Sequence, residues 1–576
     1  MTLSNILDQN LLRSRFERTF TETIFLPRCR PKILIVTDGG LGFGSGGFDL
    51  GRFIEAITTH ASVTLQPIVT LAHRGAHPSP VSIGGVSYPV KTGFVFNTAT
   101  PALTKANYDQ LWLFGINATG GITDAEVQKI AAFMNAGGGI FATGDHATLG
   151  SAISARLPRI RHMRDWASVP MGLEPLPTAQ RRIDTVVNPG SNGLYEFEDQ
   201  SDNIPQRIYP NYAVTGPGAG SWTATIHPLL RMPGAPLSRT AGMPSQFSND
   251  MDVLPDHPHE SECFEISTTS KASALNGTYT LAGLNFAEFP TAASGGGKVG
   301  AEIVAFSVSG GRSVLNGDWK PPVRPRMFGA MAAFDGHKAN PLPGQTARPG
   351  RIVCDATWHH YVNINLDGSG SGRTGLGTGT GAGFVPSANL LKIYRYYQNI
   401  LDWVQPSNRR ICWVLYKLVS IRFHPALFEE LVDPGELRLP GQVEALGRGA
   451  IQLLREAEGE DAGRQLVFDA LRTDEKTAGI ADHLAAESSE PTPIDEESFV
   501  ARAIGQALID LAQALPALDD AKLEKAFGDK GHEALEKKVH ASIAAGAAVA
   551  IDHQAKTLAI RAKTIEGLRK TARELA

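Results

Sequence analysis

The stretch YDQLWLFGINATGGITDAEVQKIAAFMNAGGGIFATGDH, residues 108–146, decides the fold of the first part of this chain. Residues 108–115 are a short apolar run that predicts a buried strand. Thr123 and Glu126 have the spacing of a capping box, which predicts the start of a helix. Residues 139–143 (GIFAT) predict a second buried strand. A strand, a helix and a strand in this order predict a right-handed crossover between two parallel strands.

The same alternation of strand and helix signals extends on both sides of this stretch. Residues 32–37 (KILIVT) and 62–69 predict two more strands, with helically spaced apolar residues between them. Strand signals return at residues 301–308 and 351–355, and apolar residues spaced between 390 and 404 predict a closing helix. We therefore expect an α/β domain with a doubly wound, mostly parallel, flavodoxin-like sheet.

The composition of the chain changes near Pro406. Residues 1–405 are expected to form the α/β domain, in which the Pro-, Gly- and Ser-rich residues 165–300 form an irregular insertion or cap. Residues 406–576 are rich in Ala, Leu, Glu, Lys and Arg at helical spacing and predict an all-α accessory region, with a softer boundary near residue 490. We expect this helical tail to make a homo-oligomer or to bind a protein partner.

Length and composition restrict the classes of function. The 576 residues carry a formal net charge of -4 and no long Lys/Arg run, which argues against nucleic acid binding. The four cysteines are too sparse for a disulfide framework and fit a reducing compartment. The N-terminal residues do not have the pattern of a secretory signal, and the longest apolar run, residues 411–421, is too short to span a membrane. The expected location is the cytoplasm.

Residues 108–146 resemble the class I glutamine amidotransferase-like superfamily, and most of all its trehalose-utilisation-protein-like branch. Members share a strand, an LSDAE-type helix start, an AGGG turn, a second strand and a sharp turn, and this chain has ITDAE, AGGG, GIFAT and GDH in that order. The resemblance extends over residues 1–160 and, more loosely, over 301–355. It implies a doubly wound α/β fold for this part of the chain.

The turn after the second strand departs from the amidotransferase pattern. The amidotransferases carry a nucleophilic cysteine there, supported by a histidine and a glutamate, whereas this chain has Gly144-Asp145-His146. Cys29 and Cys263 are far away in sequence, so thiolate glutaminase chemistry has no candidate at this turn. The named branch often lacks the cysteine too, so the resemblance implies the fold and not glutaminase activity.

Histidines and carboxylates follow several of the predicted strands, and ligand sites of open α/β sheets lie beyond the carboxyl ends of strands. Each of these segments pairs an acidic residue with one or two histidines. The candidate site residues are Asp145, His146, His257, His259, Glu260, His337, Asp355, His359 and His360.

Two kinds of chemistry fit this set. Imidazole and carboxylate are ligands for divalent transition metals, and a hydrolytic site needs about three of them and an open position for water. The metal in this case would be zinc or manganese, and its candidate ligands are His146, His257, His259, Glu260, His337 and His360. Candidates for catalysis as base, orienting group or nucleophile are Asp145, His146, Asp355 and His359.

Structural roles compete with both readings, because Asp-His pairs in loops often only cap helices or hold turns. His359 and His360 are adjacent, so in an extended backbone at most one of them points into a shared site. A site for some other polar ligand also fits the same residues. The four arginines between residues 156 and 164 form either a solvated, salt-bridged face or a clamp for an anionic substrate.

Gly42, Gly44 and Gly47 satisfy the spacing G-x-G-x-x-G between a predicted strand and a helix. No acidic residue ends the second predicted strand, and the loop is longer than the usual tight turn, so we expect neither nicotinamide nor flavin. The glycines serve a turn, or a backbone nest for an anionic group.

Two hypotheses of function follow. The first is a hydrolase, metal-assisted or not, that acts on a polar small molecule through the His/Asp cluster at the carboxyl ends of the sheet. The second is a non-catalytic protein that senses a ligand or acts as a scaffold, with a degenerate amidotransferase-like pocket and a helical tail that binds a partner.

Overall fold

The computed structural model describes the chain from residue 30 to residue 575, apart from a set of internal segments. These segments are residues 61–66, 146–147, 167–204, 216–222, 233–237, 241–249, 256–260, 312–313, 316–317, 320–322, 372–373, 429, 432–438, 459–461, 486–494 and 516–528. The chain divides into two units, of which one is Arg30–Pro406 and the other contains Ser407–Ala576. The division lies next to the change of composition at Pro406.

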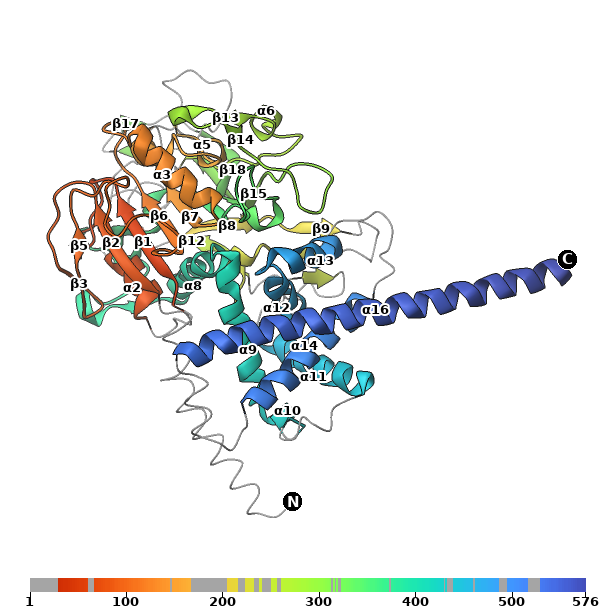
Figure 1. Ribbon diagram of the computed structural model, residues 1–576. Helices are drawn as coiled ribbons and strands as arrows, with labels where there is room; N and C mark the ends of the chain where they lie inside the picture. Colours follow the sequence, from red (N-terminus) through yellow and green to blue (C-terminus); the bar gives the residue numbers. More distant parts are fainter. Residues whose placement is uncertain are drawn as a thin grey trace, which may run out of the picture. The chain divides into compact units, whose positions relative to one another are not determined.

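A central sheet with strand order β12-β8-β15-β18-β19-β7-β6-β1-β2-β5 is the frame of the first unit (Figure 1). From β19 to β5 neighbouring strands are parallel, and from β18 to β12 they are antiparallel. The parallel strands are β1 (Lys32–Thr37), β2 (Ile68–His73), β5 (Val90–Lys91), β6 (Gln110–Phe114), β7 (Gly139–Thr143) and β19 (Ile352–Asp355). The antiparallel strands are β8 (Gln206–Pro210), β12 (Val253–Leu254), β15 (Ala301–Gly311) and β18 (Val323–Phe334).

Helices cover both faces of the parallel strands, as in a doubly wound fold. Leu34 and Val36 of β1 belong to one apolar cluster with Val127 of α3 (Asp124–Asn135). On the other face, Phe53 of α2 (Gly51–Thr58) contacts Phe114 and lies 5.0 Å, between ring centroids, from Tyr397 of α8 (Ala388–Trp403). The strands are buried on both faces, which explains why their sequences are continuously apolar rather than alternating.

The local signals at residues 108–146 are confirmed. The side chain of Thr123 accepts a hydrogen bond from the Glu126 N–H, and the Glu126 carboxylate accepts one from the Thr123 N–H, which together form the capping box of α3. Gly137 adopts a left-handed φ of 93°, which ends the helix before β7. Arg74, the residue after β2, forms a salt bridge with Glu126, so the capping residue also connects α3 to the sheet.

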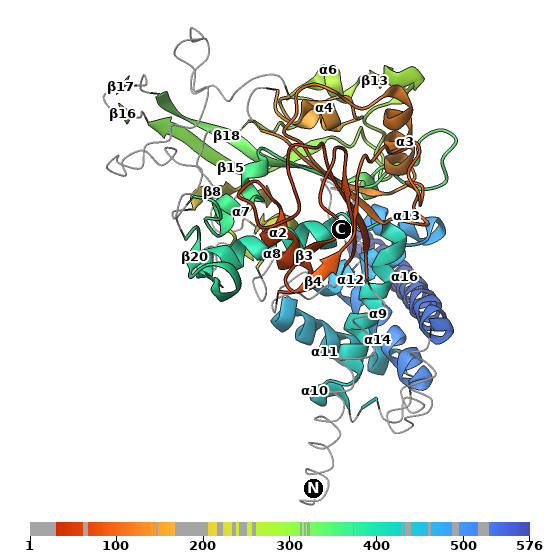
Figure 2. The same ribbon diagram turned by 90° about the vertical axis from the view of Figure 1, so that its left-hand side faces the viewer.

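Two predicted elements differ from the structure. The second strand was expected at residues 62–69, of which 62–66 lie outside the described residues, and the strand that is described there is Ile68–His73. The region expected to be an insertion or cap, residues 165–300, supplies β8 and β12 to the central sheet. β8 pairs antiparallel to β15, and β12 pairs antiparallel to β8. These strands are short and pair with chain far away in sequence, so no local pattern marks them. Figure 2 shows β15 and β18 as a long paired ribbon.

Shorter elements surround this frame in the first unit. They are β3 (Val81–Ile83), β4 (Val86–Tyr88), α4 (Ser151–Ser154), α5 (Ile160–Met163), β9 (Ala213–Thr215), β10 (Thr223–Thr225), η3 (Pro228–Leu230), β11 (Ser238–Thr240), α6 (Ala272–Leu275), β13 (Thr278–Tyr279), η5 (Leu281–Gly283), β14 (Phe286–Ala287), β16 (Val314–Leu315), β17 (Asp318–Trp319), η6 (Gly336–Lys338), η7 (Trp358–His360), α7 (Asn363–Leu366), β20 (Gly377–Thr378), η8 (Gly381–Gly383) and β21 (Val385–Pro386).

The second unit is helical around one apolar core that includes Leu446, Leu466, Ile504 and Ile543. Its elements are η9 (Ser407–Arg409), α9 (Arg410–Arg422), α10 (Pro425–Phe428), α11 (Pro440–Glu458), α12 (Ala462–Leu471), α13 (Glu475–Ala485), α14 (Glu496–Ala514) and α16 (Asp529–Leu575). Within the described residues, no helix combines the length and the apolar character that crossing a bilayer requires.

The cysteines behave differently in the two units. Cys263 and Cys354 are buried free thiols of the first unit. Cys412 of α9 is disulfide-bonded, and its partner lies outside the described residues. The sparse spacing of the cysteines therefore does not by itself indicate a reducing compartment, because a single bond between distant cysteines leaves no local pattern.

Candidate functional site

The carboxyl ends of the parallel strands form a row of polar side chains. In the register of the sheet, Thr37 is level with His73 on one side and, through Phe114, with Thr143 and Asp355 on the other. Side chains of in-register neighbours point to the same face of a sheet. The residues that follow each strand enter the loops at the carboxyl edge of the sheet. Ligand sites of α/β sheets lie at this edge, so we describe it as the candidate functional site.

Asp145 and His359 meet above β7 and β19. The His359 Nε2 lies 3.2 Å from the Asp145 Oδ2, and neither residue is exposed. The hydroxyl of Thr357 donates a 2.9 Å hydrogen bond to the other carboxylate oxygen, Asp145 Oδ1. The same hydroxyl oxygen accepts the His359 N–H at 3.0 Å. Thr357 therefore fixes both members of the pair, and sequence reasoning missed it because threonines after strands are common.

The surroundings of this pair hold its backbone in place. The guanidinium of Arg164, which is buried, donates to the carbonyl oxygen of Asp145 at 2.6 Å and to that of Ala356. The Trp358 N–H donates to the carbonyl oxygen of Gly144 at 2.7 Å, and the indole stacks on the His359 ring with centroids 4.0 Å apart. The two loops are therefore joined by hydrogen bonds as well as by the side-chain pair.

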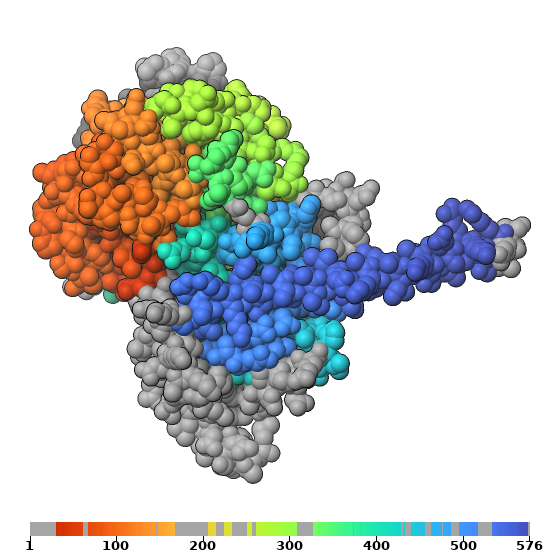
Figure 3. Space-filling view, in the orientation of Figure 1, coloured from red at the N-terminus to blue at the C-terminus, as the bar shows by residue number. Residues whose placement is uncertain are grey.

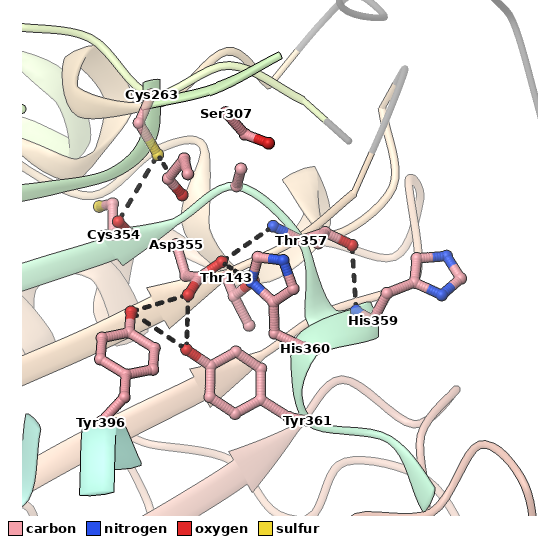
Figure 4. A network of polar contacts seen from close by, with 12 residues as sticks. Thr143, Cys263, Ser307, Cys354, Asp355, Thr357, His359, His360, Tyr361 and Tyr396 are labelled. Carbon is pink, nitrogen blue, oxygen red and sulfur yellow. Dashed lines mark hydrogen bonds and ion pairs between the residues drawn. The ribbon is translucent and has the colours of Figure 1, made fainter. Parts of the chain in front are cut away.

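Asp355 is the centre of a second, deeper network (Figure 4). Its Oδ2 accepts hydrogen bonds from the hydroxyls of Tyr361, at 2.6 Å, and Tyr396, at 2.8 Å. Its Oδ1 lies 2.6 Å from the His360 Nδ1. Burial, and then the neighbouring Asp355 carboxylate, raise the pKa of Tyr361 and of Tyr396 well above the usual value, so both phenols are protonated donors.

His360 is engaged at both ring nitrogens. Its Nε2 lies 2.9 Å from the side-chain amide nitrogen of Gln206, which always donates, so this ring nitrogen accepts and Nδ1–H donates to Asp355. Gln206 in turn accepts a hydrogen bond from the hydroxyl of Ser307. A metal ion bound at either ring nitrogen would displace one of these bonds, so the arrangement favours a structural role for His360.

The two adjacent histidines therefore serve two different carboxylates, His359 with Asp145 and His360 with Asp355. The expectation that at most one of them enters a shared site rested on an extended backbone. Instead Trp358–His360 is a turn of 3-10 helix, capped by Thr357. Successive side chains in that helix point about 120° apart, which separates the two rings all the same.

His337 lies at the other edge of the sheet. It follows β18, which is antiparallel to β19, so that Phe334 at the end of β18 pairs with Ile352 at the start of β19. The carboxylate of Asp335 caps this turn and forms a salt bridge with Arg351. His337 therefore does not join Asp145 and His359, because the direction of β18 reverses which end of the strand faces the site.

His146, His257, His259 and Glu260 lie outside the described residues. In the part of the chain that is described, no three His, Cys, Asp or Glu side chains are grouped to hold a metal ion. Among the candidates, Asp145 and His359 come together, Asp355 and His360 lie behind them, and His337 is separate.

The glycine-rich loop encloses a carboxylate of its own chain. The Asp49 Oδ2 accepts hydrogen bonds from the N–H groups of Gly44, at 3.0 Å, and Gly46, at 2.8 Å. A side chain at Gly42 would collide with the same carboxylate, since its Cβ would lie 2.1 Å from the Asp49 Oδ1. The backbone donors of this loop thus hold an internal anion, which explains the need for small residues there.

Two more titratable groups lie at the same edge of the sheet: Asp38, which follows the first predicted strand, and His73, which was not singled out in the sequence. Burial raises the pKa of Asp38, and hydrogen bonds from the N–H groups of Asn117, Gly40 and Ile116 oppose that shift. Burial lowers the pKa of His73, whose Nδ1 accepts the Gly75 N–H. Asp38 follows β1, where the rule of strand ends finds it, whereas His73 ends β2 and was missed because that strand was expected to end at residue 69.

The arginines after the turn do not share one environment. Arg159 and Arg164 are buried and Arg161 is largely buried. Arg156 is 38% exposed and forms a salt bridge with the exposed Asp124, as expected for a solvated, salt-bridged face.

Glu288 accepts hydrogen bonds from the Arg159 N–H at 2.6 Å and from the Arg161 Nη2 at 2.6 Å, and its Oε2 lies 3.3 Å from His162 Nε2. Burial would raise the pKa of Glu288, but the hydrogen bonds from His162, Arg161 and the Arg159 N–H outweigh it and lower the pKa to about 2.

The turn at Asp145 also lacks the backbone strain of a nucleophile elbow. Of the described residues other than glycine, a positive φ occurs at Arg159, Lys271 and Ala282, and Asp145 is not among them.

No protein-family model matches the chain, and no curated protein matches it.

Proposed function

We propose that this protein is a hydrolase that acts on a polar small molecule, with Asp145 and His359 at the reacting centre. The observation that carries the proposal is the 3.2 Å contact between the Asp145 Oδ2 and the His359 Nε2, fully buried at the carboxyl edge of the parallel strands. Histidine is the commonest general acid or base of enzymes, and a neighbouring carboxylate can orient its ring and stabilise the protonated form.

The roles follow from the hydrogen bond that Thr357 donates to Asp145 and from the 3.2 Å contact between the Asp145 Oδ2 and the His359 Nε2. Thr357 occupies the Asp145 Oδ1, which directs Oδ2 toward the imidazole of His359. In this arrangement Asp145 orients the ring and stabilises its protonated form, while His359 takes a proton from the attacking water and returns it to the leaving group. Asp355 and His360, which are engaged with Tyr361, Tyr396 and Gln206, form a rigid support below the pair.

The same geometry suits a metal-assisted form. A tetrahedral ion bound at about 2.0 Å holds two ligand atoms about 3.3 Å apart, close to the observed distance of 3.2 Å. Asp145 and His359 would then be two ligands of zinc or manganese. His146, the next residue in the sequence, and the segment with His257, His259 and Glu260 are the candidates for the third. The metal would supply a water of lowered pKa as nucleophile.

The scaffold supports the substrate class. The parallel strands follow the order β2-β1-β6-β7-β19, which is the flavodoxin-like order 2-1-3-4-5. With the resemblance of residues 108–146, we infer a cysteine-less member of the amidotransferase-like class. Substrates of that scaffold are polar small molecules such as carbohydrates and amide derivatives, and the polar strand ends suit them. The reaction class rests on the Asp145–His359 pair and not on the scaffold.

A second candidate function is ligand sensing or scaffolding without catalysis. The complete burial of Asp145 and His359 favours it, since a closed pair of this kind also serves as a structural ion pair. The turn without a cysteine or a strained residue is consistent with a scaffold that has lost the chemistry of its relatives.

The deciding experiment combines metal content with turnover. Protein purified without an affinity tag is analysed for transition metals and then tested on chromogenic esters, amides, phosphates and glycosides. The variants are Asp145→Asn and His359→Ala, and the control is His553→Ala, an exposed histidine of α16. We expect turnover of one substrate class that falls at least a hundredfold in the two site variants and stays unchanged in the control.

Metal near one equivalent, lost in both site variants, supports the metal-assisted form. Less than about a tenth of an equivalent, unchanged in the variants, overturns that form and leaves the acid–base form. If no substrate class is turned over and the variants change nothing but stability, the hydrolase proposal is wrong and the sensing function stands.

A further inference from the structure

Helix α16 continues far beyond the core of its unit. Its first half packs against α14 through buried side chains, among them Val539, Ile543 and Ala547. From residue 551 to residue 573 none of its side chains is buried. Figures 1 and 3 show this half as a single rod that leaves the other helices of the unit. Most helical stability in proteins comes from the packing of an apolar face, so a partner would stabilise this uncovered half.

An apolar stripe runs along the uncovered half. Ile565 and Leu568 are 65% and 66% exposed, and Leu558 is 37% exposed. Ile565 follows the buried Ala547 by 18 residues, which is five turns at 3.6 residues per turn, so both lie on the same line along the helix. The uncovered stripe therefore continues the face that packs on α14.

The sequence of this half repeats every seven residues. Lys-Thr followed by a small or branched apolar residue recurs as residues 556–558 (KTL), 563–565 (KTI) and 570–572 (KTA). With Leu558, Ile565 and Ala572 at position a of a heptad, the three lysines fall at position f, on the opposite side of the helix. A seven-residue apolar repeat stays on one line only when two helices supercoil around each other.

We propose that residues 556–575 pair with the same segment of a second copy of this chain, as a two-stranded antiparallel coiled coil centred between Glu566 and Gly567. About this centre, Ile565 of each chain packs on Leu568 of the other, and Arg561 lies opposite Ala572. The small alanine leaves room for the arginine side chain to reach solvent. The contact is isologous, so it closes as a dimer.

Charge favours a second copy in this orientation. The lysines of the repeat point away from the seam, and position g is threonine in each repeat. The charge beside the seam is therefore Arg569 at position e, whose nearest residue at position e of the second copy is the uncharged Ala562. A parallel pair would place the two Arg561 side chains against each other in the seam, which costs stability. The antiparallel pair separates the two Arg561 side chains and keeps the apolar contacts between Ile565 and Leu568.

The first test is the mass of the full-length protein in solution, by sedimentation equilibrium at micromolar concentration. We expect twice the mass of one chain. Ile565→Glu should raise the dissociation constant at least a hundredfold, because it places two carboxylates in the seam. The matched control is Ile560→Glu: Ile560 is 66% exposed but lies about 140° around the helix, at position c, so its dimer should persist.

A monomer, or a dimer that both variants weaken equally or neither weakens, overturns the proposal. So does a monomer whose α16 binds vesicles of anionic lipid or a different protein. Orientation is tested with nitroxide labels on Lys556→Cys. An antiparallel pair separates the two labels by about 31 Å along the axis in addition to the width of the pair, whereas a parallel pair holds them level and separated only by that width, about 20–24 Å. The short distance would overturn the antiparallel arrangement.

Discussion

Replacing Glu288 by glutamine should destabilise the α/β unit in a pH-dependent manner. The carboxylate is fully buried and its folded-state pKa is about 2, against 4.5 for the free side chain. A depressed pKa contributes stability above the unfolded value, and the contribution is lost as pH falls through the folded value. Because one pKa unit is worth 1.36 kcal/mol, the contribution is about 3 kcal/mol at pH 7 and about 1.4 kcal/mol at pH 3.

The assay is calorimetry of full-length wild-type protein and Glu288→Gln between pH 3 and pH 7. For a unit of this length, about 3 kcal/mol corresponds to a midpoint lower by about 4 °C at pH 7, and the difference should at least halve at pH 3. The control is Glu265→Gln, an exposed carboxylate of the same unit, which should leave the midpoint unchanged. A difference for Glu288→Gln that stays constant with pH would refute the linkage argument.

Three further substitutions test single contacts by urea denaturation. Thr123→Ala removes the cap of α3 and should cost about 1 kcal/mol; no measurable change would mean that the salt bridge alone holds the helix start. Asp355→Asn should cost about 3 kcal/mol or more, because it removes the charge that two phenols and an imidazole share, whereas Tyr396→Phe removes one donor and should cost about 1 kcal/mol. Equal losses of stability in Asp355→Asn and Tyr396→Phe would contradict the proposed hydrogen-bond network. Gly139→Ala should cost about 1–3 kcal/mol, since its Cβ would lie 1.8 Å from the Val404 carbonyl oxygen, and a neutral result would show that α8 can shift away.

The elements with local signals could be predicted from the sequence. The capping box of Thr123, the left-handed Gly137 and the buried runs at β6 and β7 each determine a short piece of backbone, and the structure confirms them. The places of β8 and β12 in the sheet could not be predicted. The pairing of β8 depends on contacts 100 residues away, as between Ser307 and Arg207, and β12 in turn pairs with β8. No periodicity encodes these contacts.

The candidate site divides in the same way. The rule that polar residues gather at the carboxyl ends of parallel strands identified Asp145 and Asp355. The same rule wrongly grouped His337 with Asp145 and Asp355, because the sequence does not show that β18 runs antiparallel to its neighbours. Gln206 and Tyr396 escaped attention, since an amide or a phenol gains its role from a partner that is distant in sequence.

The glycine-rich loop has a consequence for binding. The backbone N–H groups of the loop already donate to the Asp49 carboxylate. A phosphate or carboxylate from solution would have to compete with this intramolecular anion, which is present at a high effective concentration. Removal of the carboxylate, as in Asp49→Ala, would leave the N–H groups of Gly44 and Gly46 without this acceptor. The motif is then best regarded as a latent anion receptor, closed by its own chain, which one substitution could open.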